Sequence, residues 1–199
     1  MTDSQARLIL LLGLVVMMPI GFFHRLKART GESLDRRPEG WAILLTLRPL
    51  AVLFTVGLAA FMIDPKWMNW SSMRLPVLVR WIGPPFGIAA IVIATWTFRT
   101  LGANLTDTVV TRRNATLVTN GPYRWVRHPF YVAFVCGVIA GVLLTDSWFL
   151  ALAGAGAFIA IYARTRIEES YLVARFGEEY ERYMSRTGRF VPYLGRLRD

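Results

Sequence analysis

The sequence predicts an all-α integral membrane protein with about five transmembrane helices. Of its 199 residues, 54% are apolar and only 18% are charged, and the mean hydropathy is +0.40. Soluble domains of this length are less apolar. Several apolar runs approach or reach the length that a bilayer crossing requires. Because the polar segments between these runs are too short to fold alone, residues 1–199 are expected to form one membrane domain.

The amino-terminal part, residues 1–99, is expected to supply three spans. Three positive charges, Arg25, Lys27 and Arg29, follow the first run, residues 8–23, and only Arg7 precedes it, so this run is predicted to be a retained span and not a cleaved signal peptide. The second span covers residues 41–63. The third covers residues 76–98 and contains two consecutive prolines, which are expected to kink or break its helix.

The carboxy-terminal part, residues 100–199, is expected to add a helical hairpin. Its two apolar runs, residues 132–145 and 147–163, are separated only by Asp146, so their helices are predicted to run antiparallel. The first run has a GxxxG spacing, which permits close helix contact. The glycine-rich stretch in the second run has no strand before it and is predicted to serve packing, not nucleotide binding.

A polar helix and a tail are expected after the hairpin. Residues 164–184 continue the helical spacing of the last apolar run but become polar. Gly177 is expected to end or bend this helix. The tail, RFVPYL at residues 189–194, is apolar enough to dock onto the rest of the fold.

Positive charge sets the predicted orientation. Eighteen of the 23 Lys and Arg residues lie in residues 24–40, 99–128 and 164–199. Only three lie on the segments that five crossings place on the opposite side. By the positive-inside rule, the amino terminus is expected outside and the carboxy terminus in the cytoplasm. The motif GPYRWVRHPFY, residues 121–131, then lies on the same side as residues 164–184, so both can contribute to one site.

Composition excludes several classes of function. The formal charge of +10 is dispersed around the apolar runs, where membrane topology already requires it, so no nucleic-acid partner is predicted. Cys136 is the single cysteine, which excludes a disulfide framework and a thiolate metal site. His24 and His128 are the only histidines, so no metal site is predicted.

The motif GPYRWVRHPFY begins with a predicted rigid turn, and its second proline suits the first position of the next helix. A helix amino terminus with Arg124 and Arg127 beside it favours a carboxylate or phosphate. An anionic or zwitterionic cofactor fits such a place. The alternative is that both arginines only set the membrane topology and that His128 caps the helix.

A second group of charges lies where the fifth span leaves the apolar layer: Arg164, Arg166, Glu168 and Glu169. Arg164 and Glu168 are spaced i, i+4 and share a face, whereas Glu169 lies about 100° further round the helix. The two acids therefore are not both partners of one arginine. A carboxylate here suits ribose hydroxyls or a sulfonium, and the alternative is a solvated ladder of salt bridges.

The order of these motifs resembles the isoprenylcysteine carboxyl methyltransferase family, which is similar to phospholipid N-methyltransferases. The family pattern is GPYRxxRHPxY, then EE, then FGxxYxxY and a final VP. The chain has GPYRWVRHPFY, then EESYLVARFGEEYERY, then VP at residues 191–192. The resemblance covers roughly the carboxy-terminal half and is specific because the motifs occur in the same order.

This resemblance implies a methyltransferase that uses S-adenosyl-L-methionine, with the cofactor in a cytosolic pocket closed by the carboxy-terminal helix and loop. The implied cofactor-binding residues are Leu117, Val118, Gly121, Tyr123, Arg127, His128, Tyr131, Glu168 and Glu169. In the family pattern, His128 and Tyr131 correspond to contacts with the methionine part of the cofactor. Leu117 and Val118 correspond to the surroundings of the adenine.

The resemblance also implies the catalytic residues and the acceptor. Arg164 and Glu168 occupy the family's acceptor-side positions, with Glu168 as the candidate general base for an amine or thiol acceptor. The acceptor is expected to be lipophilic or a small membrane-accessible molecule. In-line methyl transfer needs little covalent chemistry, so alignment in a dry cavity is expected to supply most of the rate. Two alternatives are an NADPH-dependent membrane reductase, because sterol reductases have a similar carboxy-terminal half, and a non-catalytic membrane scaffold.

Overall fold

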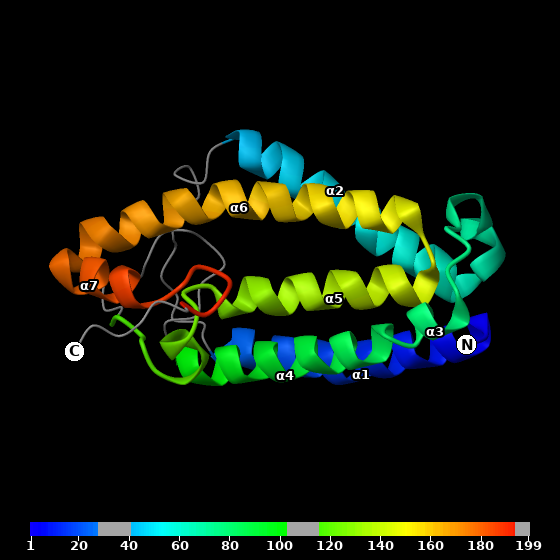
Figure 1. Cartoon of the computed structure of the whole chain (residues 1–199), viewed down its shortest axis with the longest axis horizontal. Helices are drawn as coiled ribbons and strands as arrows, with labels where there is room; N and C mark the ends of the chain where they lie inside the picture. The colour runs from blue at the N-terminus through cyan, green and yellow to red at the C-terminus, as the bar shows by residue number, and fades with distance from the viewer. Residues whose placement is uncertain (28–40, 103–115, 194–199) are drawn as a thin grey trace.

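The computed structural model describes residues 1–27, 41–102 and 116–193, which form an elongated bundle of helices (Figure 1). Its elements are α1 (Asp3–Lys27), α2 (Trp41–Ile63), the 3₁₀ helix η2 (Pro65–Ser71), α3 (Val77–Arg80), α4 (Gly83–Leu101), the 3₁₀ helix η4 (Gly121–Arg124), α5 (Pro129–Thr145), α6 (Trp148–Phe176) and α7 (Glu178–Arg186). The predicted all-α membrane architecture is confirmed.

Among the described residues, four helical segments are long and apolar enough to cross a membrane: Asp3–His24, Leu45–Ile63, Val77–Leu101 and Trp148–Phe176. The apolar α5 has 17 residues and is therefore about 26 Å long. It lies alongside α6, as the predicted hairpin requires (Figure 1).

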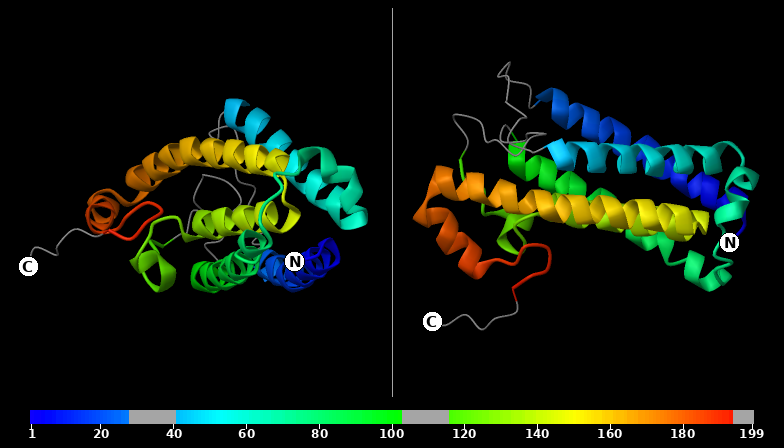
Figure 2. Two further views of the ribbon diagram at one scale, coloured as in Figure 1. Left: turned by 45° about the vertical axis from the view of Figure 1, so that its right-hand side comes forward. Right: turned by 90° about the horizontal axis from the view of Figure 1, so that it is seen from above.

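The helices alternate in direction along the bundle (Figure 1). One end, called the site end below, holds the carboxy ends of α1 and α4, the starts of α2 and α5, and all of α7. The other end, called the turn end, holds the amino terminus, η2 and the turn between α5 and α6. Figure 2 shows the chain turning back after α6, so that α7 and the tail lie at the site end. The two motifs expected to share a site therefore do lie at the same end.

The third span is interrupted, as its proline pair predicts. The chain turns at Trp81 and Ile82, between α3 and α4. Pro84 and Pro85 occupy the first turn of α4. A proline has no amide to donate, and the first helical turn leaves its amides unpaired in any case, so the prolines do not weaken α4 there.

The turn of the α5–α6 hairpin is built around Asp146. This residue has a φ of +58°, and its carboxylate accepts hydrogen bonds from the Ser72 hydroxyl, the Arg74 amide (3.1 Å) and the Leu75 amide (2.9 Å). The Ser147 hydroxyl accepts a hydrogen bond from the Leu150 amide and so caps the start of α6. The tight turn predicted at Asp146 is thus fixed to the loop that precedes α3.

Arg80 joins three helices at the turn end. Its guanidinium donates to the Asp3 carboxylate at 2.9 Å and to the carbonyl oxygen of Leu144 at 2.7 Å. Since these groups lie at the opposite end from the charged motifs, Arg80 stabilises the bundle and has no place in the candidate site.

Glycines allow α2, α5 and α6 to pack closely. A Cβ atom on Gly154 of α6 would overlap a methyl group of Val138 in α5. A Cβ atom on Gly141, the second glycine of the GxxxG spacing, would lie 3.0 Å from the Phe54 ring of α2. These glycines serve helix packing within the chain, as predicted for the glycine-rich stretch of α6.

Replacing Gly154 by alanine is expected to lower the thermal unfolding temperature of the detergent-purified protein. Val138 has few rotamers in a helix and does not yield easily to the new methyl group, and overpacking costs on the order of 1–3 kcal/mol. Gly13→Ala is the matched control, because a Cβ atom on Gly13 meets nothing within 4 Å. An unfolding temperature for Gly154→Ala as high as that of Gly13→Ala would contradict the close α5–α6 contact.

Candidate functional site

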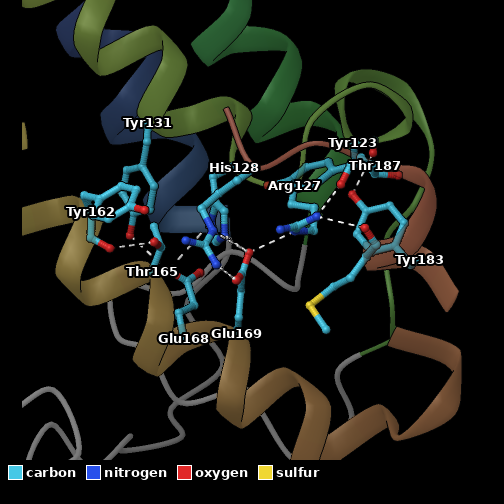
Figure 3. A network of polar contacts seen from close by, with 12 residues as sticks. Tyr123, Arg127, His128, Tyr131, Tyr162, Thr165, Glu168, Glu169, Tyr183 and Thr187 are labelled. Carbon is cyan, nitrogen blue, oxygen red and sulfur yellow. Dashed lines mark hydrogen bonds and ion pairs between the residues drawn. The ribbon is translucent and has the colours of Figure 1, made fainter. Parts of the chain in front are cut away.

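Three segments meet at the site end and form a network of polar side chains (Figure 3). They are the turn from η4 into α5, the second half of α6, and the tail after α7. Helix α6 has 29 residues and is therefore about 44 Å long, longer than an apolar layer of roughly 30 Å. Glu168 and Glu169 lie about 30 Å from its start, so the network lies about one apolar-layer thickness from the turn end.

Glu169 is the centre of this network. Its side chain is only 7% exposed. Its Oε1 atom accepts hydrogen bonds from Arg127 Nε at 2.9 Å and Arg189 Nε at 3.1 Å, and it lies 3.2 Å from His128 Nε2. Its Oε2 atom accepts a second hydrogen bond from Arg189, through Nη2. The carboxylate is enclosed by these partners, so its position is fixed by the protein itself.

Glu168 has a different environment from its neighbour. Its side chain is 27% exposed, and its Oε2 atom accepts a hydrogen bond from the Tyr131 hydroxyl at 3.0 Å. The same oxygen lies 3.9 Å from Nδ1 of His128. Apart from His128, which lies near both, the two acids have different partners because they stand about 100° apart on α6. Glu168 is the carboxylate of the pair that is accessible to a ligand.

His128 lies between the two acids. It is 5% exposed, with Nε2 beside Glu169 and Nδ1 toward Glu168. Its ring stacks on that of Tyr131, with centroids 5.5 Å apart. His128 does occupy the amino-cap position of α5, but its side chain makes no capping hydrogen bond there. Its role is therefore in the network rather than at the end of the helix.

The two arginines of the motif have different positions. Arg127 has an 11% exposed side chain and donates to Glu169 and also to the carbonyl oxygens of Met184 and Thr187. Arg124 is exposed and lies over the Trp125 ring, 4.3 Å from its centroid. Arg127 thus joins α6, α7 and the tail, whereas only Arg124 fits the simpler explanation as a surface charge.

The tail docks onto the start of α5. The amides of Arg127 and His128 donate to the carbonyl oxygens of Gly188 at 2.8 Å and Arg189 at 3.1 Å. Phe190 also packs at the site, whereas the next apolar residue, Val191, is 67% exposed. The predicted docking is therefore confirmed for the first two residues of the tail segment.

The remaining predicted residues lie in the segment before α5 and on α6. Leu117 and Val118 are partly buried in the irregular segment before η4. Gly121 has a φ of +56° and packs on α4, where an added Cβ atom would lie 2.6 Å from Thr100 Oγ1. The carbonyl oxygen of Tyr123 accepts a hydrogen bond from Tyr183 at 2.6 Å. Arg164 is half-buried on α6, one turn before Glu168.

Sequence reasoning missed Arg189 and Phe190 as residues of the site. In the sequence, both belong to the tail that is predicted to dock through its apolar character. The available signal was the arginine itself, since a charged residue at the start of an apolar segment that docks needs a partner.

Three tyrosines beside the network are expected to make the folded protein less stable at alkaline pH. Burial raises the pKa of Tyr123, Tyr180 and Tyr183 above the ordinary value of 10.0. The negative charge of Glu168 raises the pKa of Tyr123 further, and that of Glu169 raises the pKa of Tyr180 further. A raised folded-state pKa stabilises the fold fully below pH 10.0, and this stabilisation is lost as the pH rises through the folded-state values. The unfolding temperature is therefore expected to fall above pH 10.0.

Thermal unfolding at a series of pH values tests this expectation. Tyr183→Phe is expected to weaken the alkaline loss and also to lower stability at neutral pH by about 1 kcal/mol, since the Tyr123 carbonyl loses its donor. Tyr193→Phe is the matched control because Tyr193 is 60% exposed. Identical pH profiles for the two variants would show that the buried tyrosines do not cause the loss.

The sequence profile of the isoprenylcysteine carboxyl methyltransferase (ICMT) family matches residues 81–174. This is a little under half of the chain, and it includes the motif at residues 121–131 and both acids of α6. The predicted resemblance to this family is confirmed.

Two curated relatives illustrate the sequence similarity. The nickel-cobalt-cadmium resistance protein NccN of Alcaligenes xylosoxydans xylosoxydans is 37% identical over 88 residues, which are 44% of this chain and 41% of that protein. The protein-S-isoprenylcysteine O-methyltransferase of Dictyostelium discoideum is 30% identical over 130 residues, which are 64% of this chain and 54% of that protein. The matched part thus spans about half of these relatives' length.

The similarity of fold extends further along the chain. The solved structure of the eukaryotic intramembrane Ras methyltransferase ICMT matches with a TM-score of 0.56 at 20% sequence identity. The match covers 94% of this chain and 73% of that chain. It therefore includes amino-terminal helices that carry no motif of the family.

Proposed function

We propose that this chain, which matches the isoprenylcysteine carboxyl methyltransferase family over residues 81–174, is a membrane methyltransferase that uses S-adenosyl-L-methionine. The observation that carries the proposal is the placement of Glu168. Its partly exposed carboxylate is held by Tyr131 beside the buried His128, within the matched segment.

The donor set at the site end suits this cofactor, which when bound supplies a methyl group on a positively charged sulfonium. The Glu168 carboxylate offers negative charge to a sulfonium and acceptor oxygens to ribose hydroxyls. The Tyr131 hydroxyl fixes that carboxylate at 3.0 Å. We assign His128 and Tyr131 to the methionine part, and Leu117 and Val118 to the adenine.

We assign the other predicted cofactor-binding residues to positioning this set. Arg127 and Glu169 are bonded to each other and nearly buried, so we assign them to positioning. Gly121 and Tyr123 form the turn that brings Arg127 and His128 to the start of α5.

On the acceptor side we assign Arg164 and Glu168. They lie one turn apart on α6, where the helix reaches the edge of the apolar layer. Glu168 accepts the proton that an amine or thiol releases on methylation, and a carboxylate acceptor releases none. Arg164 adds a positive charge on the same helix face, which favours an acceptor with an anionic group.

The proposed acceptor is lipophilic or a small molecule that partitions into the membrane, because the site lies at the edge of the spans. We place the amino terminus outside and the site end in the cytoplasm. The distribution of charge supports this, since 18 of the 23 Lys and Arg residues lie on segments joined to the site end. The surrounding lipids are the other expected partner, and no nucleic acid is involved.

Transfer of label from methyl-labelled S-adenosyl-L-methionine tests the activity. Membranes that contain the chain are expected to place label in the organic phase, and membranes that contain the Glu168→Gln variant at the same level are expected to place much less there. Identification of the labelled product then gives the acceptor. Equal label in both preparations would contradict the proposed activity at this site.

A further inference from the structure

Residues 187–190 lie beyond residues 81–174, which the family profile matches, yet they contact the network, where the Thr187 carbonyl oxygen accepts a hydrogen bond from Arg127 (Figure 3). We propose that Arg189 is a positioning residue of the site and that residues 187–190, called the tail clamp, hold Glu169 and His128 in place. Only the effect of the clamp on cofactor binding rests on the proposed function.

The first support is the geometry of the ion pair. Arg189 donates from both Nε and Nη2, one bond to each oxygen of Glu169. Such a forked pair fixes the plane of a carboxylate as well as its position. The pKa of Arg189 is raised by its hydrogen bonds to Glu169, despite the opposing effect of burial. A lysine has a single ammonium group and does not reproduce this fork.

The second support is the backbone pairing between the tail clamp and the start of α5. Val126 and Gly188 form a parallel bridge, and the next two amides of the motif donate to the clamp. A Cβ atom on Gly188 would overlap the carbonyl oxygen of Val191, so the backbone has space for glycine only. The amides of Arg127 and His128 are therefore satisfied by the tail.

The third support is the packing of Phe190. Its ring contacts four others, with centroid distances of 5.9 Å to His128, 6.5 Å to Tyr131, 5.7 Å to Phe158 and 6.1 Å to Tyr162. Phe190 thus covers the ring stack formed by His128 and Tyr131. Phe190 therefore packs on the same site in which its neighbour Arg189 holds Glu169.

These contacts give Arg189 an indirect route to the cofactor. Arg189 orients Glu169, and Glu169 in turn lies beside Nε2 of His128. Loss of the guanidinium frees one side of the Glu169 carboxylate. It also loosens the two backbone hydrogen bonds that Gly188 and Arg189 accept from the amides of Arg127 and His128. The His128 ring then loses the fixed orientation in which it faces Glu168.

Hydrogen–deuterium exchange tests the clamp without any ligand. In Arg189→Ala, the amides of Arg127 and His128 are expected to exchange faster than in the wild-type protein. Arg186→Ala is the matched control, because Arg186 is exposed on α7 and bonds to a carbonyl of its own helix. If the amides of Arg127 and His128 exchange equally slowly in Arg189→Ala and in Arg186→Ala, the proposed clamp is wrong.

Binding of S-adenosylhomocysteine tests whether the clamp acts through Glu169. Arg189→Ala and Glu169→Gln are each expected to weaken binding by about tenfold, and Arg189→Lys by less. If Arg189 acts through Glu169, the double variant is expected to bind about as weakly as either single variant. A double variant whose loss is the product of the two single losses would overturn the positioning role.

The two measurements separate the failure of the clamp from the failure of the proposed function. If the wild-type protein does not bind S-adenosylhomocysteine, the proposed function fails and the exchange experiment alone decides the clamp. If the wild-type protein binds it and Arg189→Ala binds equally well, the positioning role is wrong although the proposed function stands.

Discussion

Replacing Glu168 by glutamine is expected to lower the rate of methyl transfer by about a hundredfold or more. Glutamine keeps an oxygen that accepts the Tyr131 hydrogen bond, but it has no negative charge for a sulfonium and takes no proton from an acceptor. The change falls on a partly exposed side chain and should leave the fold intact. The measurements are the initial rate of methyl transfer and the thermal unfolding temperature of the same preparation.

Glu179→Gln is the matched control for this result, since Glu179 is an exposed carboxylate on α7. It is expected to keep the wild-type rate. If Glu168→Gln also keeps that rate while remaining folded, Glu168 is not the reactive carboxylate, and the assignment of the acceptor side to α6 is wrong.

Replacing Glu169 by alanine is expected to destabilise the protein by about 3 kcal/mol or more. The substitution removes the shared partner of Arg127 and Arg189 and leaves a nearly buried guanidinium without its counter-charge. The expected value is at the lower end of such effects because Arg127 keeps its bonds to two carbonyl oxygens. Denaturant unfolding in mixed micelles measures the free energy of unfolding.

Glu179→Ala provides the comparison, because it removes an exposed carboxylate from the neighbouring helix. Its free energy of unfolding is expected to lie within about 0.5 kcal/mol of the wild-type value. An equally small change for Glu169→Ala would mean that the network of Figure 3 does not hold α6, α7 and the tail together.

The helical architecture was predictable because it depends on local features of the sequence. The run at residues 41–63 coincides with α2, and the proline pair marks the break between α3 and α4. Gly177 was expected to end or bend the last helix, and with a φ of +54° it does separate α6 from α7.

The site was predictable where its residues lie on regular elements and only partly elsewhere. The i, i+4 spacing and the 100° offset indicated that the two acids are not both partners of one arginine. Glu169 pairs with Arg127 and Arg189, whereas Glu168 accepts a hydrogen bond from Tyr131. Sequence spacing did not reveal which acid is enclosed, because the answer depends on Arg189, twenty residues further along. That contact arises from α7 turning the chain back toward the start of α5 (Figure 2).

Titration of the detergent-purified protein with S-adenosylhomocysteine, and separately with NADPH, tests the central proposal most directly. We expect saturable binding of S-adenosylhomocysteine that Glu168→Gln weakens and Glu179→Gln does not, with no binding of NADPH. Binding of NADPH alone would favour a reductase, and binding of neither compound would favour a scaffold. Either result would contradict the account of the site end as the cofactor site of a methyltransferase.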